Sequence, residues 1–304
     1  MTSGKAINTA HIVLAVIFAA GLAVGTFFDE PIARAVYAPD SVFAYIMTVL
    51  GQYIFFASFG IFAGALCRQA AVCKTVSPKK RVFCCVFCGY LTVSTSTIGA
   101  AAVMHYECLG ALFPGVDFSF FFLLIFGLLT MFPLFFVGYA AGKKEYDPEL
   151  KNTLIRILLF ITVTALFIGL LKLFFTRPRF RVTLLGYGIE GIYPWFRAIG
   201  KTPYYEAGIH DFGLVSNEFR SFPSGHSTMS VASIYIFPAL AYAISKLKKR
   251  EWLLFAVGLI YGLAVMLSRM LLGAHYLSDV SAGALIAVGM SFAFTNIKFK
   301  RRSR

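Results

Sequence analysis

Charged residues are scarce in this sequence, since they make up 14% of its 304 residues while 59% are hydrophobic. A typical soluble domain carries about 25% charged residues, so this composition excludes an ordinary soluble domain with a charged surface. Disorder, a collagen helix and a coiled coil are excluded as well, because each has a different composition. The sequence therefore predicts a membrane protein.

Cysteines are too few and too poorly placed for a disulfide framework. Five of the six lie in or beside the second and third apolar runs or in the loop between them, where oxidation is not expected, and Cys108 has no evident partner. Cys85 and Cys88 have the spacing of half a zinc site, but a second ligand pair is missing. We expect small apolar helix residues here and no bound metal.

Long hydrophobic runs are what the sequence has in abundance. A spanning helix needs about 20 apolar residues, and eight stretches meet or approach this length. They lie at residues 11–28, 42–66, 83–104, 118–141, 154–175, 227–245, 252–271 and 279–297. These runs exceed the length of a strand, and a bilayer requires that backbone polar groups be satisfied within each segment. The predicted fold is an all-α, polytopic membrane bundle of about eight transmembrane helices, beginning with an uncleaved helix rather than a signal peptide.

Lysine and arginine are distributed unequally between the two sets of connections. The N-terminus, three loops and the tail on one side hold 19 of the 28 cations and 4 of the 14 acids, whereas the other side holds 9 and 10. The sides therefore carry net charges of +15 and −1. By the positive-inside rule both termini are cytoplasmic and the loop 176–226 is extracytoplasmic. We expect a bacterial inner-membrane protein without a nucleic-acid partner, in which the tail KFKRRSR is a topology signal.

Three polar clusters occur after the charged, linker-like loop at 142–153. They are KLFFTRPRFR at 172–181, SFPSGHS at 221–227 and SRMLLGAHYLSD at 268–279. Each lies at the outer end of a predicted span, so topology alone brings all three to one membrane face. Arginine and lysine side chains suit the oxygens of a phosphoryl group. We predict an N-terminal portion, 1–141, with spans 1 to 4, and a catalytic portion, 142–304, with spans 5 to 8.

Each candidate residue in these clusters also has a local explanation. Ser224 and Gly225 could direct backbone amides at an anion, or Ser224 could only cap a helix. A histidine and an aspartate at 275 and 279 are spaced i, i+4, which suits a nucleophile or base with its orienting carboxylate but also suits a structural pair. Lys172 and Arg269 could be interface cations. A single site on one face explains all of them together.

The clusters resemble the signature of the type 2 phosphatidic acid phosphatase (PAP2) superfamily, in particular its membrane lipid phosphatases. That signature reads K-x6-RP, then PSGH, then SR-x5-H-x3-D. The matching residues are Lys172, Arg179, Pro223, Ser224, Gly225, His226, Ser268, Arg269, His275 and Asp279. The first block departs from the pattern, because Phe180 follows Arg179 while Arg177-Pro178 stands two residues earlier. The register favours Arg179 as the phosphate ligand, with Arg177 as the alternative.

The resemblance implies catalysis through a phosphohistidine. His275 would attack phosphorus and Asp279 would hold its tautomer, while His226 would protonate the leaving group and then activate water. The equatorial oxygens would be held by Lys172, Arg179, Ser224, Gly225 and Arg269. Neither a cofactor nor a metal ion is expected.

The implied substrate is a lipid phosphate or diphosphate in the bilayer. Undecaprenyl diphosphate, lipid A, phosphatidylglycerophosphate and phosphatidic acid all fit this description. A lipid-to-lipid phosphotransferase of the same family is an alternative. A phosphate-selective transporter is the alternative from a different class, although the sequence lacks a clear inverted repeat and charge at the middle of its spans. The sequence does not indicate the oligomeric state.

Overall fold

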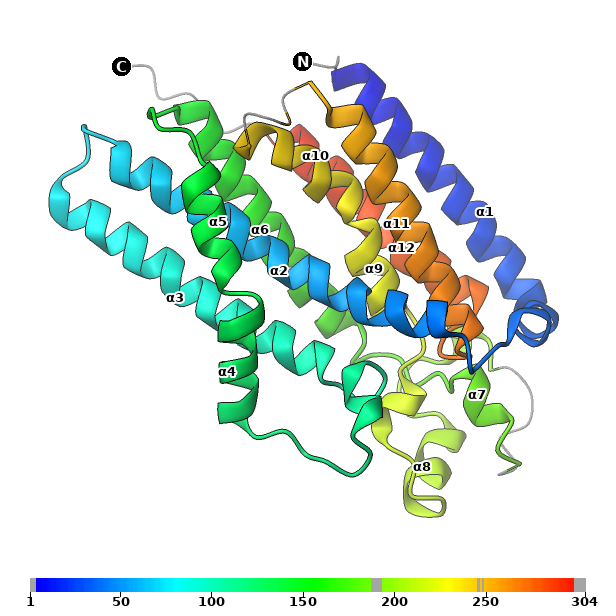
Figure 1. The fold of residues 1–304 in the computed structure, drawn as a ribbon. Helices are drawn as coiled ribbons and strands as arrows, with labels where there is room; N and C mark the ends of the chain where they lie inside the picture. Colours follow the sequence, from blue (N-terminus) through cyan, green and yellow to red (C-terminus); the bar gives the residue numbers. More distant parts are fainter. Residues whose placement is uncertain (1–3, 187–192, 245–246, 248, 298–304) are drawn as a thin grey trace. The chain divides into compact units, whose positions relative to one another are not determined.

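The computed structural model of this chain describes every residue except 1–3, 187–192, 245, 246, 248 and 298–304, and the described part is built from helices (Figure 1). Its α-helices are α1 (Gly4–Val36), α2 (Val42–Val72), α3 (Pro78–Val103), α4 (Phe120–Thr130), α5 (Pro133–Ala141), α6 (Pro148–Leu171), α7 (Phe180–Thr183), α8 (Pro203–His210), α9 (Gly225–Val231), α10 (Ser233–Ala243), α11 (Glu251–Leu271) and α12 (Leu277–Asn296). Its 3-10 helices are η1 (Leu109–Leu112), η2 (Trp195–Arg197) and η3 (Ser216–Phe219). The described residues form no strand, only an isolated bridge between Phe175 and Ile199. The expected all-α class is confirmed.

Seven helices in the described part are long and apolar enough to cross a membrane. Six are α1, α2, α3, α6, α11 and α12, and the seventh is the α4–α5 pair over Phe120–Ala141. The expected span at 227–245 is present as α9 and α10, which are separated at Ala232 and are 7 and 11 residues long. Neither alone reaches the roughly 20 residues of a spanning helix, but only Ala232 lies between them, so a crossing here stays a prediction. Residue 245 of the expected span lies outside the described residues. The apolar helices identify a membrane protein.

The chain divides into two compact units, each assembled from three separate stretches. Unit 1 comprises Met1–Gly51, Val163–Ala232 and Ile260–Phe292, and unit 2 comprises Gln52–Thr162, Ser233–Leu259 and Ala293–Arg304. Boundaries fall inside α2, α6, α11 and α12, so each of these helices contributes residues to both units. All three polar clusters belong to unit 1. The expected division of the sequence after residue 141 stays a prediction, and the cationic tail lies outside the described residues.

Two glycines allow helices of unit 1 to pack backbone against backbone. A Cβ at Gly25 of α1 would contact the backbone nitrogen of Ser278 in α12, and a Cβ at Gly283 of α12 would contact the carbonyl oxygen of Ser224 at the start of α9. Small residues permit such close approaches between membrane helices. The first half of α12 is therefore held between α1 and the beginning of α9.

Helix α1 is kinked near its C-terminal end. Phe28 has non-helical φ and ψ angles of −125° and 17°, and Pro31 follows three residues later inside the same helix. Proline lacks an amide hydrogen, and its ring clashes with the carbonyl four residues earlier, which belongs to Phe27. Asp29 follows the distortion directly and is buried, with 4% of its surface exposed.

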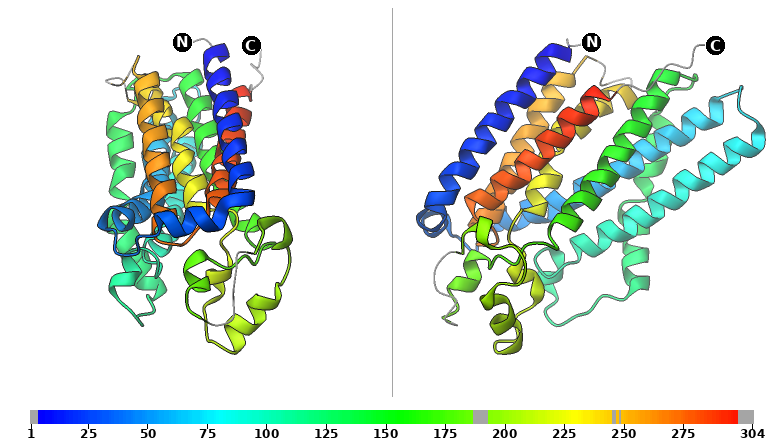
Figure 2. Two further views of the ribbon diagram at one scale, coloured as in Figure 1. Left: turned by 90° about the vertical axis from the view of Figure 1, so that its right-hand side faces the viewer. Right: turned by 180° about the vertical axis from the view of Figure 1, so that it is seen from behind.

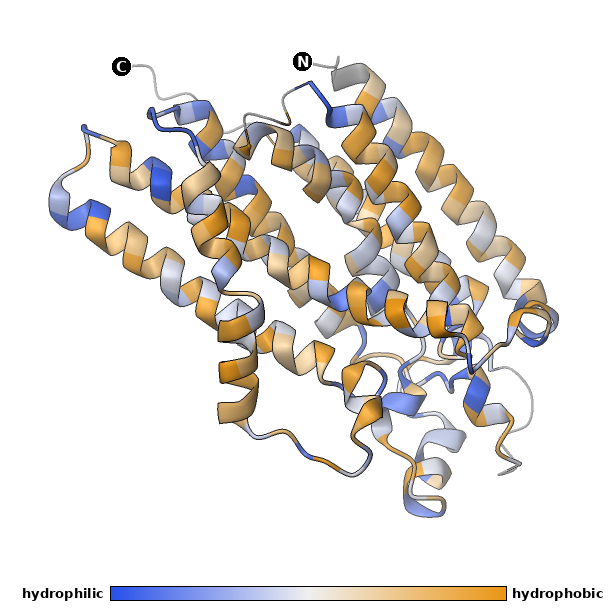
Figure 3. Ribbon diagram, viewed as in Figure 1, coloured by the Kyte–Doolittle hydropathy of each residue, from blue (hydrophilic) through white to orange (hydrophobic). Residues whose placement is uncertain are grey.

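The connection between α6 and α9 forms the end of unit 1 opposite the start of α1 (Figures 1 and 2). It contains α7, η2, α8 and η3. Val182 and Phe219 form its small apolar core, against which Tyr204, Tyr205, Ile209 and Leu214 pack. Hydrophilic residues are prominent around α7, whereas the long helices are mostly hydrophobic (Figure 3). The polar clusters thus lie where apolar helices meet a polar connection.

Unit 2 is held by aromatic and helix-to-helix contacts of its own. Phe160 of α6 packs against Tyr235 of α10 with ring centroids 4.6 Å apart. The Tyr53 hydroxyl in α2 donates a hydrogen bond to the carbonyl oxygen of Thr130 in α4 (2.8 Å). All six cysteines of the chain are described, and none of them forms a disulfide.

Candidate active site

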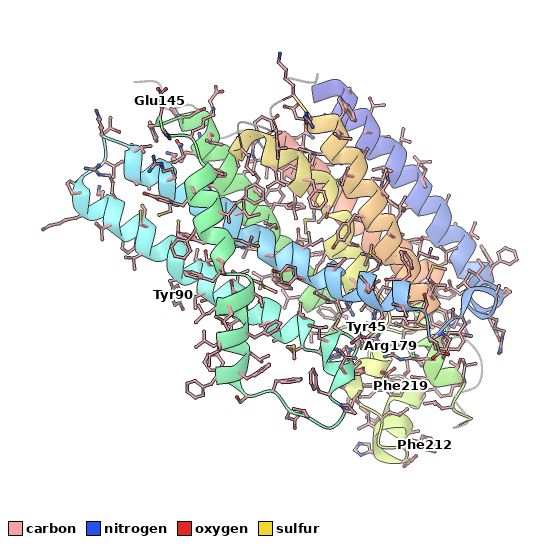
Figure 4. All side chains as sticks on the ribbon, viewed as in Figure 1. Tyr45, Tyr90, Glu145, Arg179, Phe212 and Phe219 are labelled. Carbon is pink, nitrogen blue, oxygen red and sulfur yellow. The ribbon has the colours of Figure 1, made fainter. Side chains whose placement is uncertain are left out.

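Two cations of the first cluster are fixed by the backbone that leads into the second. Lys172 directly follows α6, and its Nζ donates to the carbonyl of Arg220 (3.1 Å). Arg179 precedes α7, and its Nε donates to the carbonyl of Asn217 (3.0 Å). The Arg179 side chain, labelled in Figure 4, is only 1% exposed. Both long side chains are therefore anchored rather than extended into solvent.

Arg177 is engaged by groups of the protein on every side-chain nitrogen. Its Nη1 donates to Oδ1 of Asp279 (2.5 Å) and to Oγ of Ser278 (2.8 Å). Its Nη2 donates to Oδ2 of Asp29 (2.8 Å), and its Nε donates to the carbonyl of Tyr193 (2.9 Å). Burial disfavours its charged form, but the carboxylates of Asp279 and Asp29 outweigh this effect and raise the pKa of Arg177. The alternative ligand of the first cluster thus pairs with two carboxylates.

The second cluster forms the turn into α9. Ser224 is the N-cap of α9, and its hydroxyl accepts the N–H of Ser227, so the capping role considered from the sequence is present. The N–H of Ser224 itself donates to the carbonyl of Asp279 (3.0 Å). A Cβ at Gly225 would lie 3.4 Å from Cε and 3.8 Å from Nζ of Lys172. His226 is the next residue and is 7% exposed. The second cluster therefore contacts both the first and the third.

The third cluster spans the connection from α11 to α12. Arg269 lies in the last turn of α11, and its Nη1 donates to Oγ1 of Thr48 (3.1 Å). The backbone N–H of His275 donates to the carbonyl of Arg269 (3.1 Å). Asp279 lies in the first turn of α12, where its Oδ2 accepts the N–H of Tyr276 (2.9 Å) in the manner of a capping box. This carboxylate is therefore fixed by the start of its own helix.

The two ring nitrogens of His275 have different surroundings. Nδ1 lies 3.7 Å from Oδ2 of Asp279 and 3.5 Å from Oγ of Ser221. The Ser221 hydroxyl in turn donates to Oδ2 of Asp279. Nε2 is buried and has no hydrogen-bond partner among the described residues. Nδ1 thus faces a carboxylate and a hydroxyl, while Nε2 is left for a ligand to contact.

Burial and the neighbouring cations together favour the neutral form of the His275 ring. Burial is the largest effect, and although Asp279 opposes it, the positive charges of Arg179, Arg269 and Lys172 add to it, so that the pKa of His275 is lowered to about 3. Among the described residues, four cations and two carboxylates belong to the groups around His275 and Arg177, and together they carry a formal excess of two positive charges. They are Lys172, Arg177, Arg179, Arg269, Asp29 and Asp279. The structure therefore brings the three clusters together around one neutral histidine.

Several described residues bond to charged side chains of this site although the sequence did not predict them as site residues, and they include Ser221, Ser278, Asp29 and Thr48. Ser221 and Ser278 lie beside motif residues, whereas Asp29 and Thr48 come from α1 and α2. An acid within an apolar helix is a signal that could have found Asp29, because such residues are costly unless they are paired. Thr48 carries no comparable signal, since a threonine in an apolar helix can bond to its own backbone.

The family model of the PAP2 superfamily matches residues 153–303. This part of the chain belongs to the PAP2 superfamily. All three clusters lie inside the match, so the recognition made from their spacing is confirmed, and members of this family are phosphatases. No curated protein and no solved structure matches the chain. Helices α1 and α2 lie outside the PAP2 match, and the roles assigned to the site residues from the resemblance stay predictions.

Proposed function

We propose that the protein is an integral membrane phosphatase that hydrolyses a lipid phosphomonoester or diphosphate through a phosphohistidine on His275. The observation that carries this proposal is the group of cations around a buried, neutral histidine whose Nε2 has no hydrogen-bond partner in the part of the chain that the structure describes. Phosphoryl transfer depends mainly on positioning and charge stabilisation. This arrangement supports both.

In the first step, Nε2 of His275 forms a bond to phosphorus, and the bond between phosphorus and the leaving oxygen breaks. A protonated ring has no lone pair for this attack, so the low pKa of His275 supports the role. Asp279 and Ser221 face Nδ1 and orient the ring. The equatorial oxygens are stabilised by Lys172, Arg179, Arg269, the Ser224 hydroxyl and the Gly225 amide. His226 gives its proton to the leaving oxygen.

In the second step, water takes the place of the leaving group. His226 is now unprotonated and accepts a proton from the water as its oxygen bonds to phosphorus. The bond between phosphorus and Nε2 of His275 breaks, which releases inorganic phosphate and restores the neutral ring. With a diphosphate substrate, the group that leaves in the first step is the lipid monophosphate.

The reaction takes place at the extracytoplasmic face of a bacterial inner membrane. Net charges of +15 and −1 on the two sets of connections support this orientation, because the connection between α6 and α9 belongs to the less positive side. A substrate phosphate at the head-group level would meet the cations, while its tail stays in the bilayer. Tail burial at about 0.8 kcal/mol per CH₂ would hold the lipid there.

The decisive experiment compares substrates on the purified, full-length protein. A panel of phosphatidic acid, phosphatidylglycerophosphate, lipid A and undecaprenyl diphosphate is assayed in one detergent, beside a short-chain analogue and glucose 6-phosphate. We expect far higher kcat/KM for a long-chain lipid and release of free phosphate. Equal values would point to soluble substrates, and phosphate found on a second lipid would identify a phosphotransferase.

The role of His275 is tested by His275→Ala, which we expect to lower kcat by about 10⁴-fold or more, as nucleophile removal does in other enzymes. His210→Ala is the matched control, because His210 is exposed on α8.

Vanadate should inhibit by resembling the five-coordinate state. The described residues contain no group of three His, Cys, Asp or Glu that could hold a metal ion, so EDTA should have little effect. Turnover by His275→Ala, or strong inhibition by EDTA, would contradict the proposal.

A further inference from the structure

We propose that Asp29 of α1, acting with Arg177, is a positioning residue for the catalytic pair of Asp279 and His275. The proposal rests on the function proposed above, and it goes beyond it by assigning part of the site to a helix outside the PAP2 match. Asp29 touches neither the ring of His275 nor the place of the substrate in the proposed mechanism. Its effect reaches the histidine through two connected contacts.

The first contact runs through a shared guanidinium. Nη2 of Arg177 donates to Oδ2 of Asp29 (2.8 Å), and Nη1 donates to Oδ1 of Asp279 (2.5 Å). The side chains of all three residues are at most 4% exposed. A guanidinium is planar and rigid, so holding one of its nitrogens restricts where the other can lie. Asp29 therefore limits the position of the Asp279 carboxylate.

The second contact holds the beginning of α12. Oδ1 of Asp29 accepts the backbone N–H of Ser278 (2.9 Å), and Oδ2 also accepts the Ser278 hydroxyl. The first N–H groups of a helix have no partner within that helix and attract negative charge. Asp29 of α1 thus accepts a hydrogen bond from a free N–H group in the first turn of α12. Asp279 directly follows Ser278 in that turn. Both contacts constrain the same carboxylate.

The two arginines of the first cluster also have different roles in this arrangement. Arg177 pairs with two carboxylates, whereas Arg179 is among the cations whose charge disfavours protonation of His275. Arg177 belongs to an Arg-Pro pair that stands two residues before the position in the pattern, and it takes part in the positioning network. The departure of this sequence from the K-x6-RP pattern is explained if Arg179 meets phosphate while Arg177 connects Asp29 to Asp279.

The test uses the full-length enzyme and the fastest lipid of the panel. Asp29→Asn keeps the shape of the side chain but removes its charge and offers an amide to Arg177. We expect kcat to fall about 10- to 100-fold, because small displacements of a catalytic group have effects of this size. KM and the inhibition constant of inorganic phosphate should change less than about twofold, since no phosphate ligand is altered. Glu30→Gln is the matched control, because the neighbouring Glu30 pairs with Arg34 and its side chain is partly exposed.

A double-mutant cycle separates positioning from a general structural role. If Asp29 acts through Asp279, adding Asp29→Asn to Asp279→Asn should cost less than about threefold further in kcat. If the loss of kcat in the double variant equals the product of the losses in the two single variants, the proposal is overturned. A wild-type kcat for Asp29→Asn would also overturn it. If His275→Ala remained active, the proposed function itself would fail, which is a different outcome.

A milder variant keeps the test decisive if Asp29→Asn does not fold. Ser278→Ala removes one donor to Asp29 and leaves the backbone N–H bond in place. We expect a loss of a few-fold in kcat with unchanged KM, and no further loss when it is combined with Asp279→Asn. Wild-type turnover in Ser278→Ala, or a loss that multiplies with that of Asp279→Asn, would overturn the proposal.

Discussion

Arg177 and Arg179 lie two residues apart and have different partners. The guanidinium of Arg177 bridges Asp29 and Asp279, while the Nε of Arg179 is held by a backbone carbonyl of the loop before α9. A side chain that already joins two buried carboxylates is poorly suited to bind a third anion. The two arginines should therefore respond differently to substitution.

We predict that Arg179→Ala lowers kcat/KM by about 100-fold or more, because it removes a charged donor from the developing phosphorane. The inhibition constant of inorganic phosphate should rise in parallel. Steady-state kinetics with phosphate as inhibitor measure both constants. An unchanged affinity for phosphate would show that Arg179 is not its ligand.

We predict that Arg177→Ala mainly lowers stability. Removing one partner of a buried ion pair costs about 3–5 kcal/mol, since the remaining carboxylates lose their compensating charge. Thermal unfolding in detergent should show this loss, while phosphate should inhibit the surviving folded enzyme with nearly its normal constant. Arg197→Ala, on the exposed surface of the same connection, serves as the control. A stable Arg177→Ala enzyme that cannot bind phosphate would reverse the assignment.

The protonation of His275 gives a pH prediction. Its pKa is about 3 in the folded protein and has an ordinary value of 6.5, so the unfolded chain takes up a proton below pH 6.5 that the folded protein does not. This contribution to stability is complete above pH 6.5 and declines as the pH falls toward 3, by about 2 kcal/mol between pH 7 and 5. Unfolding measurements should show a smaller decline in His275→Asn, which cannot titrate. Equal pH dependence in both proteins would mean that the folded His275 titrates normally.

At the scale of elements, the first turn of α12 is the part that the other helices position. Its Ser278 N–H donates to Asp29 of α1, its Asp279 carbonyl accepts the N–H of Ser224 at the start of α9, and it carries the Asp279 carboxylate. Gly25 permits the approach of α1, because a Cβ there would contact the backbone of Ser278. In the proposed network, the distance between α1 and α12 therefore affects the position of the Asp279 carboxylate beside His275.

We predict that Gly25→Ala destabilises the protein by about 1–3 kcal/mol, since overpacking forces backbone shifts, and that it lowers kcat as well. Gly169→Ala is the matched control, because Gly169 lies on α6 with no atom within 4 Å of an added Cβ. Melting temperature and kcat are measured for both variants. Full activity and stability of Gly25→Ala would show that the α1–α12 spacing tolerates change.

The residues of the candidate site could be predicted from the sequence because they occur at the spacings of the family signature. Residues at 172, 179, 224, 269, 275 and 279 are brought together in unit 1, and long apolar runs predict the helices that carry them. Asp29 could not be placed from spacing, since its partners lie about 150 and 250 residues away and no pattern links such distant positions. The separation of α9 from α10 was also missed, because a hydropathy window averages over a single residue such as Ala232.

At the scale of the whole molecule, the unequal charges of the connections predict the orientation in the membrane. We expect a reporter fused after Arg304 to be cytoplasmic and one inserted near Gly200 to be external, because the two sides carry net charges of +15 and −1. A reporter pair of complementary activity, such as a phosphatase and a fluorescent protein, measures this. Finding both positions on the same side would remove the argument for an external site.

The contribution of α1 and α2 to unit 1 has a consequence for how the gene can be divided. A gene fragment limited to residues 153–303 would encode every motif residue of the family signature. Its product would nevertheless lack Asp29, one of the two carboxylates that pair with Arg177, and the Thr48 hydroxyl that accepts from Arg269. Grafting this centre into another protein would require the two N-terminal helices to be carried along, even though they share no recognised signature with the family.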